Sequence, residues 1–320
     1  MNASDARVGV VGATGAVGTV TLRLLRERGY ENVRAFASAR SAGRELDKLI
    51  VEEATAQALA AGGLDLVLFS CGTSASRELV PHAVEGGALV VDKSSAYRLE
   101  EGYPLVVPEV NGDRAAEAIG TTRVVANPNC SSIPLTCVLE PLREAAGLRR
   151  VRVSTYQAVS GAGAQRMEQL RAEPSAEHDL GFDWTWEGDE TEEESKIRAE
   201  TRKILELPEL PLSATTVRIP VLVGHSQSLW VETEQPLSPE QAESVLASAP
   251  GVRLVETPTS RAATETEDVL VGRIRPDRAA ESNGLVLFLA CDNLVKGAAL
   301  NALQIAELLL DATSSASRAA

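Results

Sequence analysis

Cys130 is the residue whose surroundings best suit a covalent nucleophile. It lies in the polar, turn-forming stretch Asn127–Pro134, after a short apolar run and where a helix is predicted to begin. The unpaired N–H groups of a helix N-terminus favour the thiolate, which is the reactive form of cysteine. The other cysteines, Cys71, Cys137 and Cys291, lie inside or beside apolar runs, where most cysteines are inert. The sequence therefore predicts thiol chemistry at Cys130.

A thiol nucleophile also needs an acid or base beside it, and the chain has three histidines. His225 follows Gly224 at a predicted turn between two strands. His82 lies in a helical pattern and His178 in a polar stretch, so both are predicted to be surface residues. His225 is the candidate partner of Cys130, although sequence distance leaves open whether the two side chains meet.

A glycine-rich loop near the N-terminus predicts a dinucleotide site. Gly12, Gly15 and Gly18 follow the apolar run Val8–Val11 and open a helical pattern over Ala16–Arg28. Glycine lets the backbone turn tightly against a pyrophosphate, and the helix N-terminus supplies unpaired N–H groups. The spacing is GxxGxxG rather than GxGxxG, so a tight strand–helix turn without a ligand is the alternative.

The end of the next predicted strand indicates which dinucleotide binds. An NAD site carries an acidic residue there for the ribose 2′-hydroxyl. This chain instead has Arg40 between Ser38 and Ser41. A guanidinium binds phosphate in a bidentate manner, so the segment favours the 2′-phosphate of NADP. A free surface arginine is the alternative.

The elements that must position these residues fall into two groups. Short buried strands alternating with helices predict a Rossmann-like α/β domain with a doubly wound parallel sheet. Its predicted strands are Val8–Val11, Val33–Ala37, Leu64–Phe69, Ala88–Val91 and Val124–Ala126, with a helix over Glu78–Glu85. A helix from Cys130 to about Ala146 marks the point where the pattern changes.

Longer strands with few helices follow, and they predict an antiparallel or mixed sheet in an α+β catalytic and dimerisation domain. They are Val151–Val159, Thr215–Val223, Ser228–Glu234, Asp268–Ile274 and Gly284–Ala290. Lys296–Leu310 is a predicted amphipathic helix, and Ala312–Ala320 a frayed tail. We therefore expect a cofactor domain over 1–129, completed by 295–320, and a catalytic domain over 130–294.

The composition excludes several classes of function. A formal net charge of −14 over 320 residues argues against binding nucleic acid or an anionic membrane. No apolar run reaches the ~20 residues that span a bilayer. The four cysteines form no CxxC pair, so no metal site is expected. With no signal peptide at Met1–Arg7, we expect a cytoplasmic protein with reduced thiols.

Six blocks, in order along almost the whole chain, resemble the bacterial aspartate-semialdehyde dehydrogenase family. They are Gly12–Gly18, Ala37–Gly43, Asn127–Ser131, Tyr156–Gly163, Arg218–Ser226 and Asp292–Glu307. In that family an aspartyl phosphate acylates the cysteine, and NADPH reduces the thioester to L-aspartate 4-semialdehyde, in lysine, threonine and methionine biosynthesis. The resemblance thus implies an oxidoreductase with a small-molecule substrate, and a homodimer or homotetramer.

The resemblance also implies roles for individual residues. Cys130 is the nucleophile, Gln157 orients the acyl group, and His225 relays protons to and from the tetrahedral intermediate. The substrate-binding residues are Arg218 for the α-carboxylate, Glu193 for the α-amino group, Arg98 and Lys196 for the phosphate, and Asn129. The cofactor-binding residues are Gly12, Thr14, Gly15, Ala16, Val17, Ser38, Arg40, Ser41, Gly72, Ser160, Gly161 and Asn293. By itself the acidic run Glu187–Glu194 predicts only a solvated loop or helix start.

Three departures from the family pattern bear on specificity. Lys93 stands where the family usually has asparagine, Val295 where it has arginine, and Met167–Glu194 is shorter than usual. Two alternatives therefore stay open beside the first reading. One is a related acyl-phosphate reductase, such as one for N-acetylglutamyl phosphate. The other is a non-catalytic paralogue that acts as a binding partner.

Overall fold

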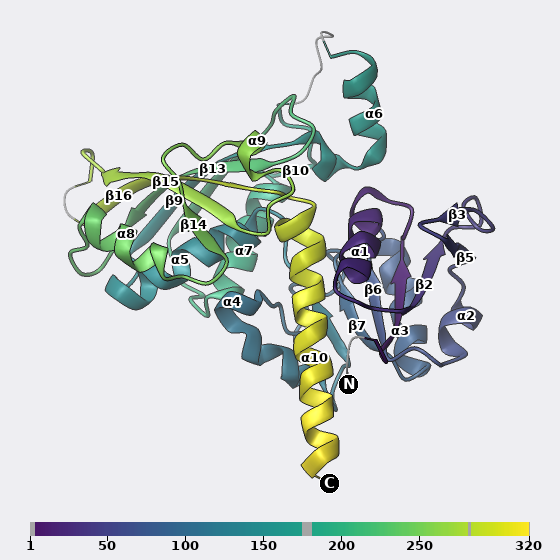
Figure 1. Cartoon of the computed structure of the whole chain (residues 1–320). Helices are drawn as coiled ribbons and strands as arrows, with labels where there is room; N and C mark the ends of the chain where they lie inside the picture. Colours follow the sequence, from purple (N-terminus) through teal and green to yellow (C-terminus); the bar gives the residue numbers. More distant parts are fainter. Residues whose placement is uncertain (1–3, 175–180, 281–282, 320) are drawn as a thin grey trace. The chain divides into compact units, whose positions relative to one another are not determined.

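The computed structural model describes residues 4–174, 181–280 and 283–319; His178 lies outside them. The chain forms two compact units (Figure 1). The first comprises Met1–Pro128 and Ala298–Ala320, and the second comprises Asn129–Gly297. Asn129 and residues 295–297 therefore belong to the second unit. Among the described residues, no helix is long and apolar enough to cross a membrane.

The sheet of the first unit has six parallel strands in the spatial order β5-β2-β1-β6-β7-β8. They are β1 Arg7–Val11, β2 Asn32–Ala37, β5 Glu52–Glu53, β6 Leu66–Phe69, β7 Leu89–Asp92 and β8 Val124–Ala126. The strand order reverses between β1 and β6, and ligands of such sheets bind beyond the carboxyl ends of the strands at this point. The predicted doubly wound sheet is confirmed.

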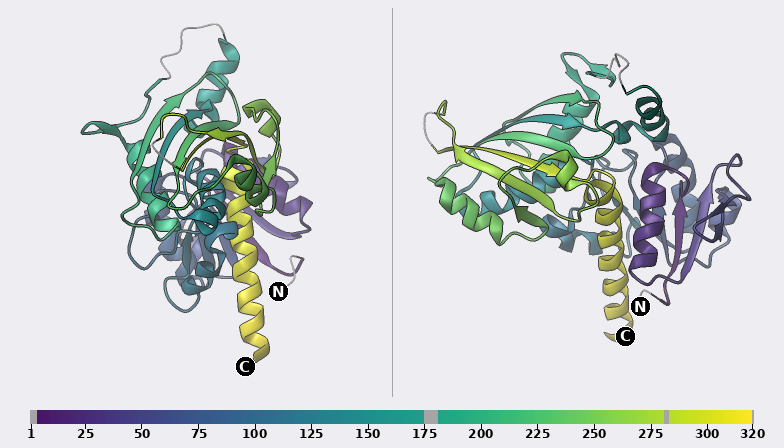
Figure 2. Two further views of the ribbon diagram at one scale, coloured as in Figure 1. Left: turned by 90° about the vertical axis from the view of Figure 1, so that its left-hand side faces the viewer. Right: turned by 45° about the horizontal axis from the view of Figure 1, so that its top comes forward.

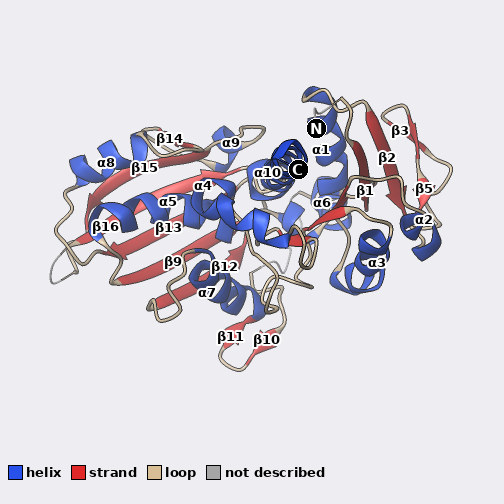
Figure 3. Cartoon of the chain, turned by 90° about the horizontal axis from the view of Figure 1, so that it is seen from below, coloured by secondary structure: helices blue, strands red, loops and turns tan. Residues whose placement is uncertain are grey.

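Helices cover both faces of this sheet, which is why β6 and β7 are buried along their whole length. Helix α1 (Ala16–Glu27) packs on α10 (Leu300–Ala319), and α2 (Ala56–Ala60) packs on α3 (Thr73–Glu85) on the other face (Figure 3). Helix α10, yellow in Figure 1 and Figure 2, continues through the segment predicted to be a frayed tail. That prediction was wrong because the segment holds no glycine or proline to end the helix.

The second unit contains a six-stranded mixed sheet in the order β12-β9-β13-β16-β15-β14, which confirms the predicted sheet type. Its strands are β9 Arg150–Gln157, β12 Leu212–Arg218, β13 His225–Glu232, β14 Val252–Leu254, β15 Val269–Pro276 and β16 Gly284–Cys291. Strand β9 pairs in parallel with β12 and antiparallel with β13. Helices α5 (Ser132–Ala146), α7 (Glu192–Ile204) and α8 (Pro239–Ala247) pack beside this sheet (Figure 3).

Two predicted strand boundaries were wrong in a way that matters for the site. The strand predicted over 215–223 ends at Arg218, because Pro220 has no N–H for a ladder hydrogen bond. The carbonyl groups of Val221 and Leu222 instead accept hydrogen bonds from the backbone of Val159 and Ser160. Strand β13 begins at His225 itself, so the imidazole projects from a strand end rather than from a free turn.

Smaller elements complete the fold. They are β3 Glu45–Leu46, β4 Leu49–Ile50, α4 Pro108–Asn111, α6 Ala164–Ala172, β10 Trp186–Glu187, β11 Glu190–Thr191, α9 Ser260–Ala263, the 3-10 helices Gly112–Ala118 and Val159–Ala162, and the π-helical turn Val295–Ala299.

Candidate active site

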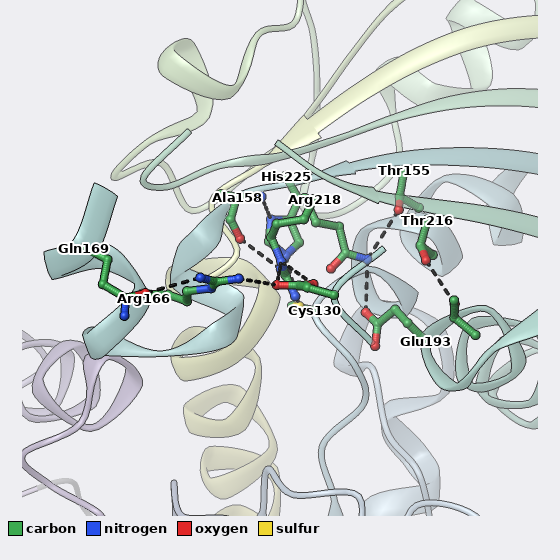
Figure 4. A network of polar contacts seen from close by, with 12 residues as sticks. Cys130, Thr155, Ala158, Arg166, Gln169, Glu193, Thr216, Arg218 and His225 are labelled. Carbon is green, nitrogen blue, oxygen red and sulfur yellow. Dashed lines mark hydrogen bonds and ion pairs between the residues drawn. The ribbon is translucent and has the colours of Figure 1, made fainter. Parts of the chain in front are cut away.

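Cys130 and His225 lie in hydrogen-bonding contact in the second unit (Figure 4). The Sγ atom of Cys130 is 3.2 Å from Nε2 of His225. Cys130 is partly exposed and immediately precedes Ser131, the N-cap of α5, while His225 is completely buried at the start of β13. Cys130 thus lies at the N-terminal end of a helix, a setting that in general favours a thiolate.

The other ring nitrogen of His225 is also engaged. The backbone N–H of Ala158 donates a 3.0 Å hydrogen bond to Nδ1 (Figure 4). Burial and, to a lesser degree, the neighbouring Arg218 cation lower the pKa of His225 to about 3. The ring is therefore neutral near pH 7. Since Nδ1 accepts, the ring proton is on Nε2, the atom that faces Cys130.

A buried carboxylate joins the two amide side chains of the site. Glu193 accepts hydrogen bonds from Nδ2 of Asn129, at 3.0 and 3.1 Å, and from Nε2 of Gln157, at 3.0 Å. Thr191 and Glu194 form a capping box at the start of α7. Only the last part of the acidic run is a helix start, because Glu187 and Glu190 lie in β10 (Trp186–Glu187) and β11 (Glu190–Thr191) and α7 begins at Glu192. Within that start Glu193 is 5% exposed and points inward.

Arg218, at the end of β12, is held by three groups. Its Nε lies 3.2 Å from Oδ1 of Asp183, its Nη1 donates a 3.1 Å hydrogen bond to the carbonyl of Ala158, and its guanidinium lies 4.4 Å from the ring centroid of Trp184. Arg166 approaches the same Asp183 carboxylate at 3.9 Å. The arginine predicted to bind a substrate carboxylate therefore already binds a carboxylate of this chain.

Two glycines at the site are closely packed. A Cβ atom on Gly161 would lie 3.0 Å from Nη1 of Arg218 and 3.4 Å from the His225 ring. A Cβ atom on Gly297, in the π-helical turn, would lie 3.2 Å from Cβ of Cys130. Next to Gly161, the Ser160 hydroxyl and the Asn293 amide are hydrogen-bonded to each other at 2.8 Å. A side chain at either position would therefore press on a neighbour in the site, Arg218 at Gly161 and Cys130 at Gly297.

The two basic residues predicted to hold phosphate belong to different units. Lys196, on α7 in the second unit, forms a 2.9 Å ion pair with Glu192. Arg98, in the first unit, donates a 2.6 Å hydrogen bond from Nη2 to the carbonyl of Lys93.

The glycine loop of the first unit has the shape of a phosphate cradle. Gly12 has a φ of +82°, and a Cβ atom there would lie 2.4 Å from the carbonyl oxygen of Ser70, after β6. A Cβ atom on Gly18 would lie 2.1 Å from the carbonyl oxygen of Gly12. The loop thus leads directly into α1, with Gly15 as its N-cap, and Thr14, Ala16 and Val17 lie at the same helix start. Its geometry fits a dinucleotide pyrophosphate.

The turn after β2 and the loop after β6 extend this site. Ser38 and Ser41 form a tight turn in which the Ser41 N–H bonds to the Ser38 carbonyl at 2.8 Å. Arg40 at its tip is exposed, and the ion pairs found among the described residues do not include it. Gly72 is the N-cap of α3, and a Cβ atom there would meet nothing within 4 Å. An anion thus has free access to Arg40.

Sequence reasoning missed several polar residues around these sites. Glu200, 1% exposed, accepts a hydrogen bond from the backbone N–H of Asn129. It follows Glu193 by seven positions, and this helical spacing was an available signal for a shared face. Asp183 gave no signal, because nothing along the chain links it to Arg218. Lys93 was not missed, since it was already noted as a departure from the family pattern; it donates a 3.1 Å hydrogen bond to Thr21, and burial lowers its pKa to about 7.

The other three cysteines lack the features of Cys130. Cys137 and Cys291 are buried, and burial raises the pKa of the Cys291 thiol well above 9. Cys71 is partly exposed, and burial of its thiol also raises its pKa. Among the described residues, no group of three or more His, Cys, Asp and Glu side chains could hold a metal ion.

Comparison with known families agrees with this geometry in both units. Residues 7–118 match the semialdehyde dehydrogenase NAD binding domain, and residues 139–185 and 184–296 match the semialdehyde dehydrogenase dimerisation domain. The first unit is therefore a nicotinamide dinucleotide-binding domain.

Individual proteins are similar over nearly the full length. The chain is 42% identical to the aspartate-semialdehyde dehydrogenase of Aquifex aeolicus, covering 95% of this chain and 98% of the relative. It is 43% identical to that of Mycolicibacterium smegmatis, covering 94% and 98%. The crystal structure of aspartate semialdehyde dehydrogenase II complexed with ASA from Vibrio cholerae superposes with a TM-score of 0.89 at 35% identity, covering 95% and 98%. The chain belongs to the aspartate-semialdehyde dehydrogenase family.

Proposed function

We propose that this protein catalyses the NADPH-dependent reductive dephosphorylation of L-aspartyl 4-phosphate to L-aspartate 4-semialdehyde. The observation that carries the proposal is the contact between Cys130 and the buried His225, at 3.2 Å, within a chain of this family. The relatives named above are aspartate-semialdehyde dehydrogenases, and the Vibrio cholerae structure is complexed with ASA. The same reaction belongs to the biosynthesis of lysine, threonine and methionine.

Chemistry begins at the Cys130 sulfur. The thiolate attacks the acyl carbon, a C–S bond forms, and the bond from that carbon to the phosphate oxygen breaks, so inorganic phosphate leaves with the electron pair. The bound dinucleotide supplies the hydride that reduces the resulting thioester. The C–S bond of the tetrahedral adduct then breaks, which releases the aldehyde and regenerates the thiolate.

His225 acts in this sequence as a hydrogen-bond donor from Nε2. Its proton lies on that atom, because Nδ1 accepts from Ala158. The donor is directed at the sulfur and at the oxygen that becomes negatively charged on the adjacent carbon, where a fixed donor stabilises the tetrahedral adduct. From the sequence we expected His225 to pass protons to and from the tetrahedral intermediate. We now propose that it only donates a hydrogen bond, because every bond change above balances without loss of the proton on Nε2.

Charged groups of the second unit suit the substrate. Arg218 would bind the α-carboxylate, which takes the place of the Asp183 carboxylate on the guanidinium. Glu193, held by Gln157 and Asn129, would accept from the α-ammonium group. Lys196 and Arg98 would bind the transferable phosphate. A substrate whose amine is acylated has no cation for Glu193, so this buried acid favours aspartyl phosphate over N-acetylglutamyl phosphate.

The free Arg40 guanidinium, flanked by Ser38 and Ser41, supports NADP as the cofactor. The remaining cofactor contacts would come from the glycine loop, Gly72, Ser160, Gly161 and Asn293.

A homodimer is the proposed assembly, consistent with the match to a dimerisation domain. On the exposed face of β9, Tyr156 is 36% exposed and stacks on Phe288 at 6.1 Å between ring centroids. This apolar pair is a suitable centre for a self-complementary contact. A reactive thiol also requires a reducing compartment, which supports a cytoplasmic location.

The test is phosphate-dependent NADP reduction with L-aspartate 4-semialdehyde, measured in the reverse direction with reduced, purified protein. We expect turnover that requires inorganic phosphate and that disappears in Cys130→Ser. Faster turnover of N-acetylglutamate semialdehyde would favour the related reductase, and no turnover of either would favour the non-catalytic paralogue. A Cys130→Ser variant with full activity would refute the nucleophile.

A further inference from the structure

Asn129, the residue before the nucleophile, has every polar group engaged by the protein itself. Its backbone N–H donates to Oε2 of Glu200 at 2.6 Å, and its Nδ2 donates to Glu193 at 3.0 Å. Its Oδ1 accepts from the N–H of Ser131 at 2.7 Å, and its carbonyl accepts from the N–H of Ile133 at 3.1 Å. Asn129 therefore bonds both to α7 and to the backbone that follows Cys130, at Ser131 and Ile133. Both atoms of its side-chain amide already have hydrogen-bond partners within the protein.

Both carboxylates that hold Asn129 come from helix α7. Glu193 and Glu200 are seven positions apart, which is about two turns and places them on one face of the helix. Both are buried, with exposed fractions of 5% and 1%. A hydrogen bond to an ionised carboxylate is about twice as strong as a neutral one, and a buried acid has no competing water. The 2.6 Å contact to Glu200 is therefore a short restraint on the backbone before Cys130, shielded from solvent.

The π-helical turn Val295–Ala299 also packs against Cys130. Gly297 packs so tightly that a Cβ atom there would be 3.2 Å from both Cβ and the carbonyl oxygen of Cys130. A shift of the backbone at 129–130 would therefore change the 3.2 Å distance from Sγ to Nε2 of His225. Glu200 and Gly297 thus both restrain the backbone that carries the sulfur.

We propose that Glu200 is a positioning residue for the Cys130 nucleophile, acting through the backbone N–H of Asn129. Its hydrogen bond reaches the backbone N–H before the nucleophile and not the Sγ atom. This role for Glu200 depends on the proposed function in one respect, namely that Cys130 is the nucleophile. The resemblance implied that Asn129 binds the substrate. We propose instead that it transmits the restraint from Glu200 to the Cys130 backbone.

Helix α7 itself offers a matched control. Glu194 is likewise buried, and it accepts backbone N–H groups of Thr216 at 2.9 Å and Thr191 at 2.8 Å. Its partners lie on β12 and at the helix start, so none is adjacent to Cys130. Glu194→Gln thus removes the same charge and weakens the same type of bond without touching the nucleophile loop.

The experiment compares Glu200→Gln, Glu200→Ala and Glu194→Gln in the full-length protein. Glu200→Gln keeps an acceptor oxygen and should lower kcat about 10-fold, with Glu200→Ala lower still, up to about 100-fold. KM for both substrates should stay within about twofold, because the bond to the Asn129 N–H is not itself a substrate contact. Glu194→Gln should lower the melting temperature to a similar extent but leave kcat unchanged.

A second readout does not depend on turnover. Iodoacetamide labelling of Cys130, followed by mass spectrometry of its peptide across a range of pH, reports the thiolate fraction and its access. We expect the Glu200 variants to change the rate and pH midpoint of this labelling, and Glu194→Gln to match wild type. Equal effects of Glu200→Gln and Glu194→Gln, or no effect of Glu200→Gln, would overturn the proposal. If wild type lacks semialdehyde turnover, the function fails, but the labelling comparison still decides this inference.

Discussion

The backbone N–H of Ala158 donates to Nδ1 of His225, and this one contact fixes the chemistry available at the opposite ring nitrogen. An imidazolium would place a second proton on Nδ1, pointed at the Ala158 N–H. The ring therefore resists protonation for a geometric reason as well as through burial. His225 can donate a hydrogen bond from Nε2 to Cys130 or to the substrate oxygen. Nε2 can accept a proton only if its own proton moves to Nδ1, and that would break the hydrogen bond from Ala158.

The protonation state of His225 can be observed directly. His82→Gln with His178→Gln leaves His225 as the single imidazole of the chain. We expect 15N NMR of labelled histidine to show a proton on Nε2, a bare Nδ1, and no titration between about pH 5 and about pH 9, where an ordinary histidine would titrate. The pKa of about 3 leads to the same expectation.

Two results would contradict this prediction: a midpoint near about 6.5, the value of an ordinary histidine, or a proton on Nδ1. The double variant must first match wild-type turnover. His82 is on the surface-exposed part of α3 and pairs with Glu85 at 3.4 Å, so its replacement should be neutral.

Asp183 competes with the substrate for Arg218. The substrate α-carboxylate must displace the Asp183 carboxylate, which lies 3.2 Å from Nε of Arg218 in a largely buried pair. We expect Asp183→Asn to lower KM for L-aspartate 4-semialdehyde about 3- to 10-fold, the equivalent of about 1 kcal/mol, with kcat nearly unchanged. Steady-state kinetics at saturating phosphate and NADP measure it.

The control is Asp189→Asn, which removes an exposed acid from the nearby turn and should leave KM as it is. A higher KM in Asp183→Asn would mean that Asp183 orients Arg218 for the substrate instead of competing with it.

Local patterns predicted most of the fold and the chemical centre. The run Val8–Val11, the glycines after it and the helix that follows are specified by residues close together in sequence, and all appear in the structure. The same holds for Cys130 at the start of α5. Such features depend on backbone conformation and burial, which short segments determine.

Contacts between distant segments could not be predicted in that way. Glu200 bonds to Asn129 across 71 positions, and Asp183 reaches Arg218 across 35. Both depend on how α7 and the segment before β10 pack on the sheet. The end of β12 was missed for a related reason: the apolar run 219–223 satisfied a strand pattern, while Pro220 and the partners Val159 and Ser160 ended the ladder.

Cofactor preference can be tested at Arg40. The exposed guanidinium would bind the 2′-phosphate, which NAD lacks, so Arg40→Ala should raise KM for NADP about 10- to 100-fold and leave KM for NAD within about twofold. Arg44→Ala is the control, because this exposed arginine follows the same turn. Equal losses for NADP and NAD would refute the assignment of the 2′-phosphate to Arg40.

Lys93 makes the stability of the first unit depend on pH. Desolvation lowers its pKa from 10.5 to about 7, against the opposing attraction of Asp92. Between these two values the unfolded chain binds a proton that the folded chain has lost, so the free energy of unfolding rises with pH. The cost of burying Lys93 is fully present below about pH 7 and is gone above about pH 10.5.

Lys93→Met should remove this dependence while filling a similar volume. We expect the variant to be more stable than wild type near about pH 7, by about 2 to 4 kcal/mol for a partly screened side chain, and the difference to vanish towards about pH 10. Urea unfolding across this range gives the difference directly, and other titrating groups cancel because both proteins share them. Lys48→Met, at an exposed lysine, should show no such slope. A difference that stays constant with pH would mean that Lys93 keeps its proton in the folded protein, with Asp92 compensating the cost of burial.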